Sequence, residues 1–270
     1  MTHYLKFNCI YVLQSLPDNE IQTGNDLIQS IKYNLFKLPS MTQELINISS
    51  LADLDFAFNH MGLRFQKNGL VPYIHFDIHG SRDGLQLKNG VLVKWDYLQP
   101  KLSELNYKIG NALFVSLASC FGAYFFRTVD PLERTPFFGY IGPVNEITVN
   151  ETEIDWAEYF NSLFSTKDFL EAIKSLIKSN GRAAYSFFSG EQIWDICSKG
   201  FLALYETRTQ KRQKMLELRR QAKKTIPGLR ISNSQLKDRL KKNINNRPAL
   251  IGQMKDYFLL RSDVRPNFDG

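Results

Sequence analysis

Two nearly continuous runs of hydrophobic residues stand out in the first half of the chain. One is Pro72–His79, which is rich in aromatic and β-branched residues, and the other is Ala112–Cys120, bounded by Gly110 and Gly122. Strands that are covered on both faces in a parallel sheet have such runs, whereas strands with one face in water alternate. The two runs therefore predict buried parallel strands, and we expect them to be neighbours in one sheet.

The rest of the pattern alternates between shorter strands and amphipathic helices. Segment 4–13 predicts a strand near the sheet edge or with one partly covered face, and 137–141 predicts a short strand. Asn89-Gly90 predicts a hairpin over 85–93. Helices are predicted over 26–36, 51–61, 96–105, 154–163 and 169–178, and, after a turn at 185–190, from residue 191. This order predicts an α/β fold with a mostly parallel sheet between helices.

Composition places the protein in a reducing compartment. The 270 residues are enough for one α/β domain with a full core, or for a domain with an appendage. The three cysteines, Cys9, Cys120 and Cys197, lie far apart and show no paired metal-ligand spacing. No signal-peptide pattern and no membrane-length apolar run is present. We expect a soluble, cytoplasmic protein without a membrane partner.

Positive charge is concentrated at the C-terminal end of the chain. The net charge is +7, but residues 201–270 hold 17 of the 34 basic residues and 6 of the 27 acidic ones, so this region is +11 and residues 1–200 are −4. Residues 201–224 lack Gly and Pro and predict a long helix, and shorter helices follow near 234–243 and 248–260. We therefore expect a domain over 1–200 and a helical basic region over 201–270, packed on the core or extending from it.

The basic region has three interpretations. The basic residues of a helix most often form a solvent-exposed face without a partner. A net charge of +11 over residues 201–270 is larger than such a face usually carries. The region would bind nucleic acid through phosphate contacts, although no recognition motif is present. We prefer docking of an acidic protein partner and keep nucleic acid as the alternative.

Chemistry is expected where the two buried strands end. His79 and Cys120 close them, and in open α/β sheets reactive groups collect beyond the carboxyl ends of the strands. A thiol there becomes a nucleophile if its pKa is lowered, and a helix beginning at Phe121 would contribute to that. His79 would transfer protons, and the N–H groups of Gly80 and Cys120 are candidate oxyanion donors. For Cys120 alone the simpler reading is a buried structural cysteine, and only the pairing with His79 favours catalysis.

Polar residues alternate along the first of these strands. His75, Asp77 and His79 share one face, and a polar row on a covered strand must be hydrogen-bonded. We favour a buried supporting network for His75 and Asp77 over direct catalysis, while Asp77 is also a candidate lining for a pocket that takes a basic side chain. A metal site is not expected, because the chain has only four histidines to supply further ligands.

The paired motifs resemble those of the caspase-like cysteine peptidases. His79-Gly80 followed by Cys120-x-Gly122 is the shared pattern, and His75 four residues before His79 is most similar to the bacterial CHAT branch, as is Val93–Leu98. The resemblance extends over about residues 1–200. It implies a three-layer α/β/α sandwich, with the predicted hairpin between the two catalytic strands. The caspase sequence Gln-Ala-Cys is absent, so aspartate specificity is not implied.

The resemblance also implies a function. His79 and Cys120 would form the dyad of a cysteine endopeptidase that needs no cofactor, with Gly80 and Cys120 as the oxyanion hole and His75 and Ser119 as supporting residues. Such enzymes cleave a partner protein, for example a gasdermin-like pore-forming protein, in antiviral defence or regulated cell death, and are commonly switched on by an activating protein. Candidate substrate-pocket residues are Asp77, Asp83, Asp130, Gly142 and Val144. The alternative is a non-catalytic interaction module that binds a partner or nucleic acid through its basic region.

Overall fold

The computed structural model describes residues 5–35, 38–179, 185–203, 216 and 247–265. The chain divides into two compact units. The first contains residues 1–129 and 135–190, and the second contains residues 130–134 and 191–270. Most of the basic region predicted over 201–270 lies outside the described residues.

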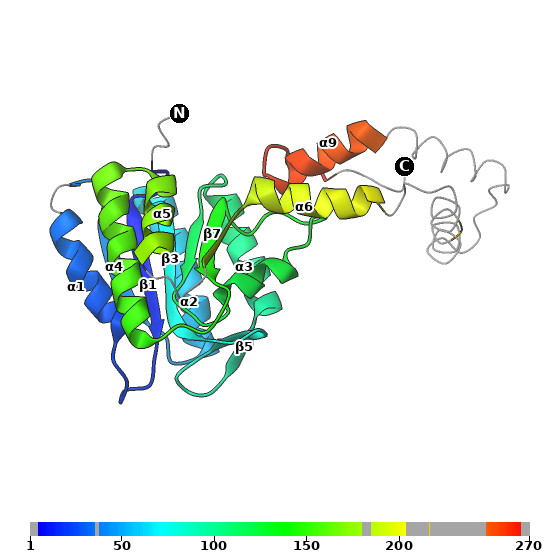
Figure 1. Cartoon of the computed structure of the whole chain (residues 1–270). Coiled ribbons are helices and arrows are strands. Elements are labelled where there is room, and N and C mark those ends of the chain that lie inside the picture. The colour runs from blue at the N-terminus through cyan, green and yellow to red at the C-terminus, as the bar shows by residue number, and fades with distance from the viewer. Residues whose placement is uncertain (1–4, 36–37, 180–184, 204–215, 217–246, 266–270) are drawn as a thin grey trace. The chain divides into compact units, whose positions relative to one another are not determined.

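A mixed, mostly parallel sheet forms the centre of the first unit (Figure 1). The strand order is β2-β1-β3-β6-β7-β8, with β8 antiparallel to β7 and the small hairpin β4–β5 attached to the end of β3. The strands are β1 (Cys9–Ser15), β2 (Thr42–Asn47), β3 (Pro72–Gly80), β4 (Gly84–Gln86), β5 (Leu92–Lys94), β6 (Phe114–Leu117), β7 (Gly139–Pro143) and β8 (Tyr185–Ser189).

Helices cover both faces of this sheet (Figure 1). On one face lie α1 (Thr23–Leu35), α4 (Val149–Thr166) and α5 (Phe169–Ser179), and on the other lie α2 (Leu51–Asn68) and α3 (Trp95–Lys108). Ser50 caps α2, because its side chain accepts from the Asp53 N–H, and the Asp53 carboxylate accepts from the Ser49 N–H. A seven-residue 3₁₀ helix, η1 (Gly122–Thr128), follows Cys120.

Aromatic packing joins β3 and β6 to α4 and α5. Tyr73 and Phe114 stack with ring centroids 5.7 Å apart, and Phe169 stacks on Phe114 at 3.9 Å. The Tyr73 hydroxyl donates to that of Tyr159 at 3.1 Å, so the polar end of this buried ring is satisfied. The two predicted strands therefore lie at the centre of the hydrophobic core.

Two predictions about the strands are wrong. β1 is not an edge strand, because every residue of Cys9–Ser15 is buried and β1 pairs with β2 on one side and β3 on the other. The edge position belongs to β2, a strand that we did not predict. Residues 185–189 form strand β8 instead of a turn, and the antiparallel pairing with β7 hydrogen-bonds their backbone.

The second unit contains α6 (Gly190–Ala203) and α9 (Arg247–Phe258). Trp194 and Phe258 pack with ring centroids 5.7 Å apart, and Lys255 pairs with Glu191 at 3.0 Å. Arg265 also pairs with Glu133, at 2.9 Å. None of the described helices is both long and apolar enough to cross a bilayer.

Candidate active site

Strands β3 and β6 are parallel neighbours, as predicted. Phe76 pairs with Leu117, and the Ala118 N–H donates to the Phe76 carbonyl at 2.8 Å. His79 and Cys120 each follow this paired position by three residues. The shared register therefore brings the imidazole and the thiol to the same carboxyl edge of the sheet.

The backbones of Gly80 and Cys120 are in close contact. A Cβ atom on residue 80 would lie 2.2 Å from the Cys120 carbonyl oxygen and 2.8 Å from the Ser119 Cβ, which is closer than real Cβ atoms approach. Only glycine fits this position without a backbone shift. The absent side chain is what allows the two motifs to meet.

The His79 imidazole has a carboxylate partner that the sequence analysis missed. Its Nε2 lies 2.7 Å from Glu20 Oε2, and about half of the His79 side chain is exposed. Glu20 is in the loop after β1, at the same edge of the sheet as His79. The sequence places Glu20 in a loop that follows a predicted strand, and this position was the available sign of a role at the site. A single Glu in a polar loop forms no motif that would mark it as the partner of His79. Because Glu20 occupies Nε2, Nδ1 is the nitrogen that remains for proton exchange.

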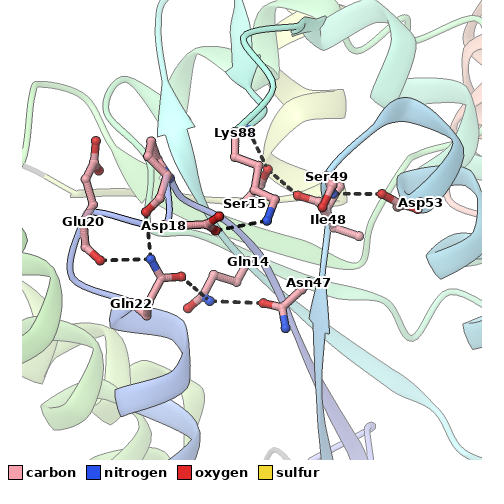
Figure 2. A network of polar contacts seen from close by, with 11 residues as sticks. Gln14, Ser15, Asp18, Glu20, Gln22, Asn47, Ile48, Ser49, Asp53 and Lys88 are labelled. Atoms are coloured by element: carbon pink, nitrogen blue, oxygen red, sulfur yellow. Dashed lines mark hydrogen bonds and ion pairs between the residues drawn. The ribbon is translucent and has the colours of Figure 1, made fainter.

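A network of side-chain amides fixes the loop that holds Glu20 (Figure 2). The buried Gln14 donates to Gln22 Oε1 at 2.8 Å and to Asn47 Oδ1 at 3.2 Å, and it accepts from the Asn25 N–H at 3.0 Å. Gln22 in turn donates to the Pro17 and Glu20 carbonyls, both at 2.9 Å. The ends of β1 and β2 therefore hold both sides of the loop.

The Cys120 sulfur lies against the backbone that follows β7. The Ile147 N–H is 3.4 Å from Sγ, and the Ile147 carbonyl is 3.7 Å away. The next residue, Phe121, has φ +58°, a left-handed conformation that costs a non-glycine residue roughly 1–2 kcal/mol. Its N–H donates to the Asn145 carbonyl at 3.0 Å, which helps to hold this turn. The helix predicted at Phe121 is the 3₁₀ helix η1, and its first residue is Gly122.

His79 and Cys120 line one small pocket of about 60 Å³. Glu20, Asp77 and Thr152 are among the other lining residues, so the walls carry two carboxylates. Such a pocket has space for part of a side chain beside the thiol.

Comparison with known proteins adds no family to this picture. No protein-family model matches the sequence, and no curated protein matches it. The chemistry of the site therefore rests on the geometry of its own residues.

The predicted substrate-pocket residues do not all meet at this pocket. Asp77 lines it, whereas Asp83, Gly142 and Val144 are not among its lining residues. Asp83 lies in the turn between β3 and β4, and Gly142 is packed against Gly122 at the end of β7. Asp130 belongs to the second unit.

His75 and Asp77 are buried and hydrogen-bonded. His75 Nδ1 is 2.7 Å from the Ser116 hydroxyl, and burial lowers the pKa of His75 to about 3, so this imidazole is neutral. The Thr23 hydroxyl donates to the Asp77 carboxylate at 2.8 Å. The two side chains therefore have separate partners. Ser119, the other predicted supporting residue, is buried, and its hydroxyl has no hydrogen-bond partner among the described residues.

Metal ligands are not grouped in the described part of the chain. No set of three or more His, Cys, Asp or Glu side chains there has the arrangement needed to hold an ion. His75 and Asp77, the residues we considered as ligands on β3, bond to hydroxyl groups instead.

Asp77 is expected to make stability depend on pH. Burial raises the pKa of Asp77 from 3.8 to about 6, and the bonds from Thr23 and Gly24 only partly oppose this. The folded state thus binds the proton more tightly than the unfolded state, and the unfolding free energy contributed by Asp77 falls as pH rises from about 4 to 6, by roughly 3 kcal/mol. Asp77→Asn should remove this fall in urea unfolding at a series of pH values.

The exposed Asp83 provides the matched control for Asp77. Asp83→Asn makes the same chemical change in an exposed turn and keeps Asp77, so the fall that Asp77 causes should remain. Parallel profiles for the wild type and Asp77→Asn would contradict the burial argument.

Proposed function

We propose that this chain is a cysteine endopeptidase with a caspase-like fold and a His79–Cys120 dyad. The observation that supports it most is that the thiol and the imidazole line one pocket while the Gly80 and Cys120 backbones touch. Covalent catalysis requires a nucleophile and a base within reach of each other, and a third group that orients the base. Glu20 is that third group.

In the proposed reaction, His79 accepts the Cys120 proton and the sulfur attacks the carbonyl carbon of the scissile bond. The tetrahedral intermediate collapses when the C–N bond breaks and the leaving amine takes the proton from His79. Water then attacks the thioester, giving its proton to His79, and the proton returns to sulfur as the acid leaves. Glu20 at Nε2 stabilises the imidazolium that forms in each half of the reaction.

The Gly80 N–H is available as an oxyanion donor. The Ser81 N–H donates to the Gly84 carbonyl at 2.8 Å, so Ser81 and Gly84 form a hydrogen-bonded pair of the β3–β4 ladder. Hydrogen-bonded and non-hydrogen-bonded pairs alternate along an antiparallel ladder. Gly80, which pairs with Leu85, is therefore in the non-hydrogen-bonded position and its N–H points away from β4. With the Cys120 N–H it completes the proposed oxyanion hole.

We further propose that the enzyme prefers Arg or Lys before the scissile bond. The carboxylates of Asp77 and Glu20 line the pocket with the thiol, and no Lys or Arg is among the described lining residues. A cationic side chain would be attracted there, whereas an aspartate would meet like charge. We also propose that the substrate is a partner protein in bacterial defence or cell death, for example a gasdermin-like protein. The support for this substrate is the motif resemblance.

A library of short fluorogenic peptides tests the reaction and its preference together. We expect hydrolysis of peptides with Arg or Lys before the reporter group and at least about tenfold slower hydrolysis of those with Leu or Asp. Below pH 6 the preference should weaken, because Asp77 becomes protonated. Cleavage after Leu in preference to Arg would contradict the acidic pocket. Absence of cleavage of every peptide, together with failure of a chloromethyl ketone probe to label Cys120, would contradict the enzyme.

A further inference from the structure

Two exposed arginines on the segments that carry His79 and Cys120 have no acidic partner among the described residues. Arg82 and Arg127 form no ion pair within the described part of the chain. Four other described arginines do pair with carboxylates: Arg64 with Glu44, Arg134 with Asp263, Arg261 with Glu191 and Arg265 with Glu133. The guanidinium groups of Arg82 and Arg127 are therefore available to an external anion.

Instead of carboxylates, the two arginines contact aromatic rings. The Arg127 guanidinium carbon lies 4.2 Å from the centre of the Tyr124 ring, and that of Arg82 lies 5.6 Å from the same ring and 5.1 Å from the Phe121 ring. Phe121 and Tyr124 meet edge to face, with centroids 5.8 Å apart. Cation–π contacts hold a guanidinium group over an aromatic ring and leave its N–H groups free to donate hydrogen bonds. We refer to Arg82, Phe121, Tyr124 and Arg127 as the arginine patch.

The arginine patch is formed by the two segments that hold the dyad. Arg82 follows Gly80 by two residues, in the turn that the Trp95 indole anchors by donating to the Arg82 carbonyl at 3.0 Å. Phe121 directly follows Cys120, and η1 supplies the other two members. The patch therefore lies on the two segments that carry His79 and Cys120, and we infer that a polypeptide bound at the thiol extends to it.

We propose that the arginine patch binds an acidic segment of the polypeptide that Cys120 cleaves. Guanidinium groups bind carboxylates through paired, charge-assisted hydrogen bonds, and arginines already held against rings lose less conformational entropy on binding. Residues 1–200 have a net charge of −4, so their net charge repels an acidic segment. Within these residues, the attraction comes from the local positive charge of the arginine patch. The identity of the ligand as a substrate rests on the proposed peptidase function, whereas binding itself needs no cleavage.

Binding is measured in the Cys120→Ala background, so that turnover does not interfere. A fluorescein-labelled peptide with four consecutive glutamates is titrated by anisotropy at low salt, beside the same peptide with four glutamines. We expect the glutamate peptide to bind at least about tenfold more tightly, with an advantage that decreases as salt rises. Arg82→Gln and Arg127→Gln should each remove most of this advantage. Arg64→Gln, which replaces a partly exposed arginine on α2, is the control and should leave binding unchanged.

Equal binding of the two peptides, or an advantage that both patch variants retain, would overturn the proposal. A third peptide with phosphoserines in place of the glutamates separates the sources of negative charge, and binding more than about a hundredfold tighter than the glutamate peptide would replace the acidic segment with a phosphorylated one. Failure of the peptidase proposal gives a different result. In that case the cysteine-containing chain cleaves no peptide, but the glutamate advantage and its loss in the patch variants remain.

Discussion

Cys120→Ala is expected to reduce peptide hydrolysis by at least about a thousandfold, with substrate binding retained. Removing the nucleophile of a coupled acid–base pair removes the covalent pathway as a whole, and only the contribution of binding and oxyanion donors remains. The thiol is partly buried against Ile147, so alanine leaves only a small cavity and the fold should persist. Initial rates on the best library peptide, with circular dichroism of both proteins, measure the effect.

Matched variants show whether the loss belongs to the dyad. Cys197→Ala, which removes a partly exposed thiol in the second unit, should keep wild-type rates. His79→Ala should be nearly as inactive as Cys120→Ala, and their double variant should be no worse, because the two groups act as a unit. Glu20→Gln, which keeps the size of the side chain, should lose about tenfold, since the Glu20 carboxylate is partly exposed and its effect is screened. Equal rates for the wild type and Cys120→Ala would remove the thiol from the mechanism.

The parts of the site that were predicted are those fixed by strand burial. A strand covered on both faces must be apolar throughout, and this made β3 and β6 recognisable in the sequence. Once the strands are recognised, the position of His79 and Cys120 at the carboxyl edge follows from the direction of parallel strands. The hairpin β4–β5 followed from Asn89-Gly90, because Gly90 adopts φ +83° in the turn.

The parts that were missed depend on contacts that are distant in sequence. Strand β2 contains Thr42, Gln43 and Glu44, and it was not recognised because a partly exposed edge strand needs neither a continuous nor a strictly alternating apolar pattern. Its absence from the prediction placed β1 at the edge. Glu20 contacts His79 across 59 residues of sequence, and only the folded loop brings them together.

The left-handed backbone conformation of Phe121 is another feature that the sequence did not predict. Nothing in an aromatic residue predicts φ +58°, because its side chain disfavours that region. The conformation is supported by the Asn145 carbonyl and by the contact with Tyr124. Tertiary contacts therefore override local preference at the residue after the proposed nucleophile, which is where strained backbone is commonly found in active sites.

Gly80→Ala is expected to damage both stability and activity. The added methyl group would lie 2.2 Å from the Cys120 carbonyl oxygen, and that atom belongs to a backbone held by η1 and by the segment after β7. Relief of the clash must separate the His79 and Cys120 segments, at a cost of about 2–4 kcal/mol in unfolding free energy. A shift of this kind should also lower kcat by at least about a hundredfold in the folded protein, because reacting groups tolerate little displacement.

Gly62→Ala separates this steric effect from the general effect of replacing a glycine. Gly62 lies within α2, where a Cβ atom would meet nothing within 4 Å, so alanine should be neutral or stabilise the helix by about 0.5–1 kcal/mol. Urea unfolding gives the stability of each variant, and rates measured below the unfolding transition give the activity of the folded fraction. Wild-type stability and turnover in Gly80→Ala would mean that the His79 and Cys120 segments do not need their close contact. In that case the geometric basis of the proposed dyad would be lost, even if Cys120 proved reactive.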